Sequence, residues 1–183
     1  IVWGNRVFIT AAYSDRKEGP KEMAPPPPPP PLAGNQAQQR PGGPGQPPQG
    51  GGPGQRPPED LSYLEDTWTW EVTCVELETG KELWKQVAYK GKPRIKKHAM
   101  NTYANETPVT DGKRLYVYFG MVGVFCFDLD GTLLWQKDLG AYETQNGWGT
   151  GASPVIWNDL LFIKVDNDTT SFITALDAST GKE

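Results

Sequence analysis

The sequence is poor in the residues that most often carry enzyme chemistry. Its 183 residues include one histidine, His98, and two cysteines, Cys74 and Cys126. His98 has no second histidine with which to share a metal ion, and no serine or cysteine lies in the sequence context of a nucleophile elbow. The sequence therefore nominates no catalytic residue and no metal ligand.

Two further absences limit the partners. There is no run of 18 or more apolar residues, so no segment is predicted to span a membrane. Positive charge is not in excess either, because 18 Lys and Arg residues stand against 22 Asp and Glu residues, which gives a net charge of -4. Such a chain has no broad positive field for nucleic acid, and nucleic acid is not an expected partner.

What the sequence does contain is repetition. A phrase made of an acidic strand end, a glycine turn and a tryptophan occupies 76–84, recurs at 128–135 and begins again at 177–183. An upstream phrase, in which a turn pair leads into an apolar strand, begins at Val2, Val109 and Val155. The last two are about 46 residues apart, within the range of propeller blades. We therefore predict an all-β fold, a partial β-propeller of about two and a half four-stranded antiparallel blades.

Each copy of the repeat has the pattern of two hairpins. Three glycines supply left-handed turn residues, and two tryptophans lie on the strand that returns from the turn. These five residues form the structural signature of the repeat: Gly80, Trp84, Gly131, Trp135 and Gly181. The six best-defined strands are expected at 7–10, 72–77, 115–119, 124–129, 160–163 and 173–177.

The expected domain is a single propeller fragment over 1–183. We assign 1–13 and 67–90 to the first blade, 91–140 to the second, and 141–183 to a truncated third. Fifteen of the 18 prolines fall between Pro20 and Pro58. A segment of that composition buries too little apolar surface to offset its ordering entropy, so 14–66 is predicted to be a disordered insert. The third copy stops at Glu183, before its tryptophan, and we expect a longer parent protein.

The two cysteines occupy the same place in successive copies. Equivalent positions in neighbouring blades are typically too far apart for a disulfide, which needs Cα atoms about 4.4 to 6.8 Å apart. We therefore expect Cys74 and Cys126 to be buried free thiols that act as small hydrophobes.

Two acidic motifs suggest chemistry. The segment 124–133 resembles the first motif of haloacid dehalogenase-type phosphatases, with Asp128 as nucleophile. The same slot in the other copies holds Glu76 and Asp177 before a glycine turn, so the phosphatase is kept only as a remote alternative. Asp166 and Asp168 have calcium-like spacing but lack the loop glycine and the terminal glutamate, and are interpreted as a solvated turn.

The repeated phrases identify a family resemblance. Segments 107–112 and 153–155, followed by the acidic strand end and the Thr-Gly-Lys-Glu-Leu-Trp turn, look like the pyrroloquinoline-quinone-like (PQQ-like) β-propeller repeat. That family includes quinoprotein alcohol dehydrogenases and the lipoprotein subunit of the outer-membrane β-barrel assembly machinery. The resemblance implies that Trp84 and Trp135 dock between neighbouring blades, and that the protein is extracytoplasmic in a bacterium.

For function, the resemblance implies two alternatives. The quinone-dependent enzymes hold their cofactor with adjacent cysteines, a tryptophan floor, and acidic and amide ligands to calcium. No adjacent cysteine pair occurs in this sequence. We expect a non-catalytic binding or scaffold module with a protein or small-ligand partner and no cofactor. The alternative is a fragment of a PQQ-dependent dehydrogenase, which alone would require PQQ and calcium.

A recognition surface is expected on the loops between blades, because propeller strands serve as scaffold. These loops are 96–106 and 142–150. Amide and aromatic side chains suited to binding lie there, and the candidate residues are Asn101, Tyr103, Asn105, Asn146 and Trp148. Glycine-rich packing of a tight loop is the alternative interpretation of 146–151.

Overall fold

The computed structural model describes residues 1–16, 60–98, 101–144 and 147–183. Within these ranges the regular structure is antiparallel β-sheet, with two short 3-10 helices, η1 (Ser62–Glu65) and η2 (Gly120–Val122). No helix in this part of the chain is long and apolar enough to cross a membrane.

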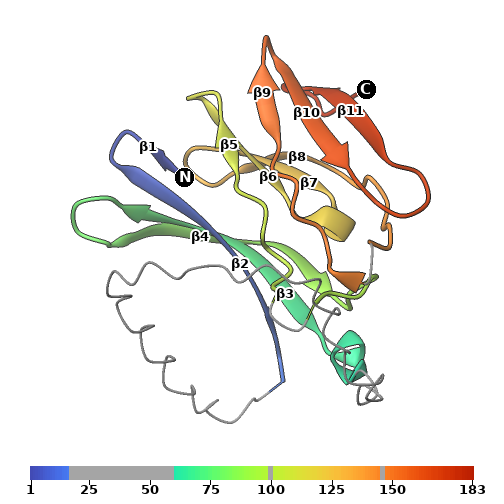
Figure 1. The fold of residues 1–183 in the computed structure, drawn as a ribbon. Coiled ribbons are helices and arrows are strands. Elements are labelled where there is room, and N and C mark those ends of the chain that lie inside the picture. Colours follow the sequence, from blue (N-terminus) through green and yellow to red (C-terminus); the bar gives the residue numbers. More distant parts are fainter. Residues whose placement is uncertain (17–59, 99–100, 145–146) are drawn as a thin grey trace, which may run out of the picture. The chain divides into compact units, whose positions relative to one another are not determined.

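Three sheets follow one another along the chain (Figure 1). The first has the order β1 (Val2–Trp3), β2 (Arg6–Ser14), β3 (Trp68–Glu76) and β4 (Glu82–Gly91). The second has the order β5 (Val109–Thr110), β6 (Arg114–Tyr118), β7 (Val124–Asp128) and β8 (Leu133–Lys137). The third contains β9 (Val155–Trp157), β10 (Leu160–Val165) and β11 (Phe172–Asp177). The predicted partial propeller of two and a half blades is confirmed.

The repeat is also a repeat of strand register. Phe8 pairs with Cys74 in the first sheet, and Tyr116 pairs with Cys126 in the second. Each cysteine is followed by a β-bulge against the last strand of its own sheet. Both cysteines are buried and free, as predicted. Burial raises the pKa of the Cys126 thiol to about 12 and also raises the pKa of Cys74.

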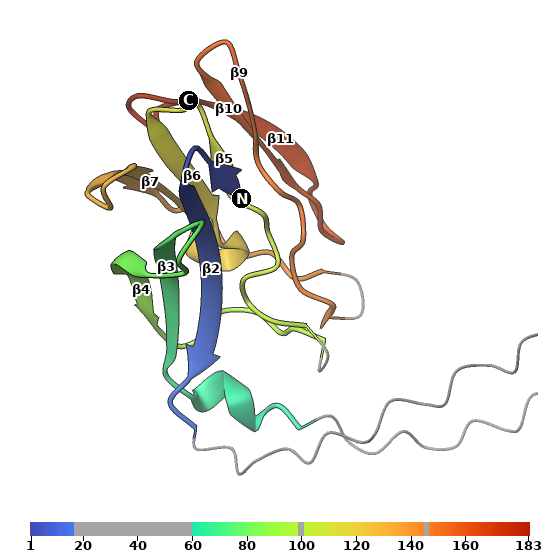
Figure 2. The same cartoon turned by 90° about the vertical axis from the view of Figure 1, so that its left-hand side faces the viewer.

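The insert interrupts the connection between β2 and β3, where the second sheet has only η2. Most of the insert lies outside the described residues. Its C-terminal end carries structure that the sequence did not indicate, namely η1 (Figure 2). The Arg16 guanidinium bonds Asp66 at 2.8 Å, and the amide of Asp15 donates to the carbonyl of Thr67 at 2.9 Å. The first blade therefore continues beyond its predicted edges at 13 and 67.

The core consists of two apolar clusters, one on each face of the second sheet. Leu115 and Val117 of β6 belong to the cluster shared with the first blade. Tyr116 and Tyr118, which alternate with them, belong to the cluster shared with the third blade. Successive strand residues point to opposite faces, so an inner blade covered on both sides needs a continuously apolar strand. This explains why β6 shows no polar alternation.

Tryptophan and glycine join one blade to the next. The indole N–H of Trp84 donates to the carbonyl of Leu129 at 2.9 Å, and its ring covers Gly131 of the second blade. Trp135 repeats the arrangement one blade later, where its N–H donates to the Ala178 carbonyl at 3.0 Å and its ring covers Gly181. The docking implied by the family resemblance is therefore present twice.

Candidate functional site

The acidic strand ends are turn residues. Asp128 Oδ1 accepts hydrogen bonds from the backbone amides of Asp130 at 3.0 Å and Thr132 at 2.8 Å. Partial burial opposes ionisation of Asp128, but backbone hydrogen bonds outweigh it and lower the pKa. Asp177 accepts from the amides of Ser179 and Thr180 in the same way. Asp128 also lies on an antiparallel strand, so the phosphatase interpretation finds no support in the described fold.

Two of the predicted recognition residues tie one loop to the next. The side-chain amide of Asn101 donates to the Trp148 carbonyl at 2.7 Å. The amide of Asn105 donates to the Thr150 carbonyl at 3.3 Å. These bonds link the loop that precedes the second blade to the loop that precedes the third. Asn101 and Asn105 thus position the loop of Trp148.

Tyr103, a third predicted residue, is buried in an aromatic group. Its hydroxyl donates to the Ile95 carbonyl at 2.8 Å, and its ring meets Trp68 edge-on at 4.8 Å between centroids. The Lys97 ammonium lies 5.7 Å from the centre of the Tyr103 ring and 5.3 Å from that of Tyr63. In this position Tyr103 anchors the first interblade loop through packing and cation–π contacts.

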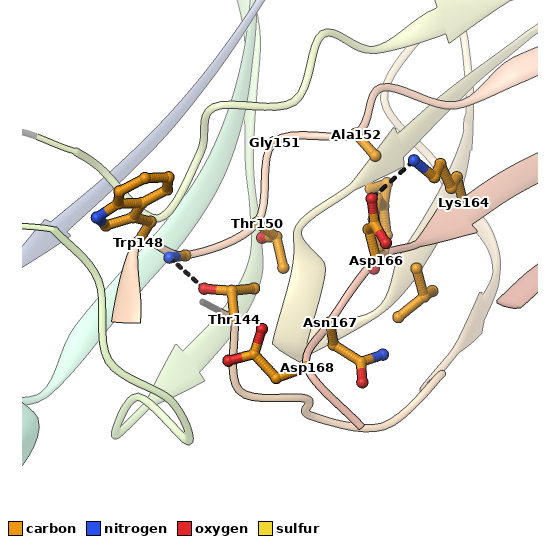
Figure 3. Close-up of a pocket in the computed structure, with 12 residues that line it drawn as sticks. Thr144, Trp148, Thr150, Gly151, Ala152, Lys164, Asp166, Asn167 and Asp168 are labelled. Carbon is orange, nitrogen blue, oxygen red and sulfur yellow. Dashed lines mark hydrogen bonds and ion pairs between the residues drawn. The ribbon is translucent and has the colours of Figure 1, made fainter. Parts of the chain in front are cut away.

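Trp148, a fourth predicted residue, lies at a surface pocket of about 490 Å3 between the second and third blades (Figure 3). The pocket is bounded by the end of β6, the loop into the third blade, and the end of β10 with the loop that follows it. Its main polar or aromatic lining residues are Tyr118, Thr144, Trp148, Thr150, Lys164, Asp166, Asn167 and Asp168. The fifth predicted residue, Asn146, lies outside the described residues.

Glycine geometry presents Trp148 to solvent. Gly147 and Gly149 flank it with φ of 65° and 87°, a conformation that glycine adopts at little steric cost. The loop is closed by the Gly149 amide, which donates to the Thr144 hydroxyl at 2.7 Å. Trp148 remains 54% exposed. The loop is therefore a tight glycine turn that leaves the Trp148 side chain exposed.

The opposite side of the pocket holds an internal ion pair. Lys164 Nζ lies 2.7 Å from Asp166 Oδ2, and this bond is the main cause of the lowered pKa of Asp166. The Ser171 hydroxyl donates to the other oxygen of Asp166 at 2.8 Å. Asn167 organises the turn, because its side-chain oxygen accepts the amides of Thr169 and Thr170. The acidic segment is a hydrogen-bonded turn, with Asp166 already paired.

Two pocket groups remain uncommitted within the described residues. The Asp168 carboxylate has no hydrogen bond or ion pair there, although its backbone amide lies 3.4 Å from the Glu143 carbonyl. The Tyr118 hydroxyl likewise has no hydrogen-bond partner among them, and burial raises its pKa. In Figure 3, Asp168 lies between Thr144 and Asn167, away from the Lys164–Asp166 pair. The Asp168 carboxylate is therefore free to meet a ligand, whereas Tyr118 is only 3% exposed.

A buried glutamate, Glu106, lies next to the pocket. Glu106 is 3% exposed, and its Oε1 has no hydrogen-bond partner. Burial raises the pKa of Glu106, while hydrogen bonding to the Thr150 side chain opposes the shift. Its charge also acts on Tyr118. Thr150 and Tyr118 both line the pocket, so Glu106 adjoins it. The equivalent residue in the third blade is Ala152.

Little in the sequence indicated this pocket. Of the four candidate residues that the structure describes, Trp148 alone lines the pocket. Asp168 was assigned to a solvated turn, and Tyr118 to a strand. One available signal was the difference between Glu106 and Ala152 at matched positions before Thr107-Pro108 and Ser153-Pro154. Glu106 is buried whereas Ala152 is only half-buried, and a buried glutamate marks a polar environment because glutamate is rarely buried without a partner.

Consecutive four-stranded antiparallel sheets, joined by a repeated tryptophan-on-glycine contact and carrying a pocket on their loops, define a repeat protein of the β-propeller class. The sequence model of one family, described as outer membrane protein assembly factor BamB, matches residues 69–183. This match covers more than half of the chain. The chain belongs to that family, which confirms the PQQ-like repeat predicted from the sequence.

Solved structures give more distant similarities. A quinohemoprotein alcohol dehydrogenase from Comamonas testosteroni is 18% identical over 63% of this chain and 18% of its own, with a TM-score of 0.46. BamB from Moraxella catarrhalis is 17% identical over 64% of this chain and 32% of its own, with a TM-score of 0.39. The chain thus spans about a third or less of either protein. No curated protein sequence matches it.

Proposed function

We propose that this chain is part of a non-catalytic propeller that binds a protein or ligand at the pocket between its second and third blades. The observation that carries the proposal is the pocket itself, where the Trp148 indole and the Asp168 carboxylate are left without intramolecular partners among the described residues. Concave sites with a few uncommitted polar groups and an exposed aromatic are typical of recognition. The loops, with the blades as scaffold, supply specificity.

The acidic groups that resemble catalytic residues are engaged in hydrogen bonds and ion pairs within the chain. Asp128 serves its turn, Asp166 is bonded to Lys164, and both cysteines are buried. These engagements support a binding role. The family description, an outer-membrane protein assembly factor, is consistent with a protein partner in a bacterial envelope, and we propose an extracytoplasmic location on that basis.

A pocket-filling variant tests the binding role. Ala152→Trp places an indole in the pocket, so small molecules from a chemically diverse fragment set that shift the Trp148 indole N–H resonance should lose that effect. The measurement is a proton–nitrogen correlation spectrum of the labelled full chain. Lys113→Trp adds the same side chain at an exposed turn in another part of the second blade, and should leave the shifts intact. Fragments that fail to reach Trp148, or that bind both variants equally, would contradict the proposal.

The second candidate function is a fragment of a PQQ-dependent dehydrogenase, favoured by the family resemblance. Mixing the full chain with PQQ and calcium distinguishes this dehydrogenase from the binding module. We expect no change in quinone absorbance and no dye-linked oxidation of primary alcohols, because the two cysteines are buried in different sheets. Saturable quinone binding with alcohol oxidation would replace the binding-module proposal with the enzyme.

A further inference from the structure

We propose that two copies of this chain associate head to tail, with the exposed face of the third blade of one copy packed on the exposed face of the first blade of the next. Two different surfaces meet in such an interface, so it is heterologous. The proposal concerns the sheet faces at the two ends of the row of blades, and it is separate from the pocket of the proposed function.

Both junctions within the chain are built in one direction. Each blade has a forward face, toward the blade that follows it in the sequence, and a backward face, toward the blade before it. Phe8, on the forward face of the first blade, shares a core cluster with Leu115, on the backward face of the second. Tyr116, on the forward face of the second blade, shares the other cluster with Leu161 of the third. A forward face thus packs on a backward face at both junctions.

The two remaining faces are apolar and exposed. On the backward face of the first blade, Ile9 follows the buried Phe8, points to the opposite side of β2 and is 48% exposed. On the forward face of the third blade, Val155, Trp157 and Ile173 are each at least 60% exposed. They pair with the residues of β10 that alternate with its buried ones, so they point away from the core. Exposed apolar groups of this kind are typical of protein interfaces.

A tryptophan-on-glycine contact supplies the specific match. Trp3 covers Gly112 of the second blade, where an added Cβ would lie 2.6 Å from the indole. Trp157 is the equivalent of Trp3, because each lies three residues before the next strand begins, at Leu160 and Arg6. Trp157 has its indole on an exposed face.

The first blade carries the complementary half of this contact. Gly4 is the equivalent of Gly112, because each lies two residues before its strand begins. Among the described residues, nothing lies within 4 Å of a Cβ added at Gly4, and the same holds at Gly80, the equivalent of the Gly131 that Trp84 covers. The first blade therefore presents two bare turn glycines where the second blade has covered ones.

A second copy of the chain is the partner that provides both halves. The second sheet lies between the first and the third (Figure 1), so the exposed tryptophan and the bare glycines are at opposite ends of the row. One copy can thus present Trp157 to Gly4 of the next without disturbing its own junctions. Burial of the exposed apolar side chains favours the contact, and a tryptophan that fills a fitted site commonly contributes most to such an interface.

Sedimentation velocity of the full chain, from low to several hundred micromolar, tests the association, and the average mass should rise with concentration. Trp157→Lys and Ile9→Lys should each weaken it by at least about tenfold, because each places a charge in an apolar contact. Leu134→Lys is the matched control, since Leu134 is 46% exposed, lies on β8 of the second blade and belongs to neither face. Its association should equal that of the unchanged chain. Near-ultraviolet circular dichroism checks that each variant is folded.

Mixing the two weakened variants tests the direction of the interface. Trp157→Lys keeps the backward face of its first blade and Ile9→Lys keeps the forward face of its third, so together they should form a one-to-one complex that neither forms alone. A monomeric chain at every concentration, no complex in the mixture, or equal weakening by Leu134→Lys overturns the proposal. Unchanged association of either face variant overturns it as well. Fragment binding at Trp148 is measured independently, so either proposal can fail without the other.

Discussion

Gly131→Ala will destabilise the chain strongly, by roughly 2 kcal/mol or more beyond the backbone cost of the same change at Gly80. An alanine Cβ at Gly131 would lie 2.7 Å from the Trp84 ring, and the backbone there has φ of 92°. Trp84 cannot move aside without losing its hydrogen bond to Leu129. The free energy of unfolding from urea titration followed by tryptophan fluorescence measures the loss.

Gly80→Ala is the matched control. Gly80 occupies the corresponding turn of the first blade, which is one residue longer, with φ of 70°, but nothing lies within 4 Å of an added Cβ. An alanine at position 80 therefore has the backbone strain of a non-glycine residue, about 1 kcal/mol, but its Cβ does not clash with a tryptophan ring. The difference between the two variants isolates the contact between blades. Equal losses at the two sites would mean that the tryptophan contact contributes little to stability.

The same contact shows why the fold was predictable from the sequence. The copies at 76–84 and 128–135 keep the order of acidic strand end, glycine and tryptophan, with the glycine four residues before the tryptophan in both, and each part has one physical task. Asp128 closes the turn, Gly131 permits both the turn and the approach of Trp84, and Trp84 spans the junction. Local demands that recur with a fixed period specify the blade, and a run such as β6 that is apolar on both faces specifies its neighbours.

The pocket was much less predictable, because its walls come from segments whose proximity depends on the packing of two blades. Trp148 was identified from its residue type and its loop. Asn101 and Asn105 were also identified by type, yet both bond the carbonyls of the next loop. An amide in a rim loop serves a ligand or a neighbouring loop equally well, and the sequence pattern is the same for both. Lys164 forms an ion pair with Asp166 at the pocket, and the sequence pattern does not indicate this pair.

The η1 segment was missed for a related reason. The sequence around 60–66 follows a proline-rich tract and has no strand pattern, so it was assigned to the insert. Its order comes from partners outside the segment. Arg16 bonds both Ser62 and Asp66, and Lys92 bonds Glu65 at 2.6 Å. Such long-range bonds have no local signature.

Glu106→Gln will raise the stability of the chain at neutral pH. The Glu106 carboxyl is 3% exposed with an unpartnered Oε1, and burial raises its pKa above the ordinary value near 4.5. A folded state whose carboxyl has a raised pKa binds more protons than the unfolded chain, so its contribution to stability is complete below the unfolded pKa and is lost as pH rises through the folded pKa. Glutamine is neutral throughout and has nearly the same shape.

The gap between the two proteins should therefore be small in acid and should widen as the pH rises, reaching about 1–3 kcal/mol in favour of Glu106→Gln at neutral pH. Urea unfolding at a series of pH values from below 4.5 to neutral measures it, since groups common to both proteins cancel in the difference. Glu78→Gln removes the same charge from an exposed turn and should give a nearly flat difference. A stability difference for Glu106→Gln that does not change with pH would contradict this expectation. It would show that hydrogen bonds to the carboxylate, chiefly from the Thr150 side chain, fully offset the cost of burying its charge.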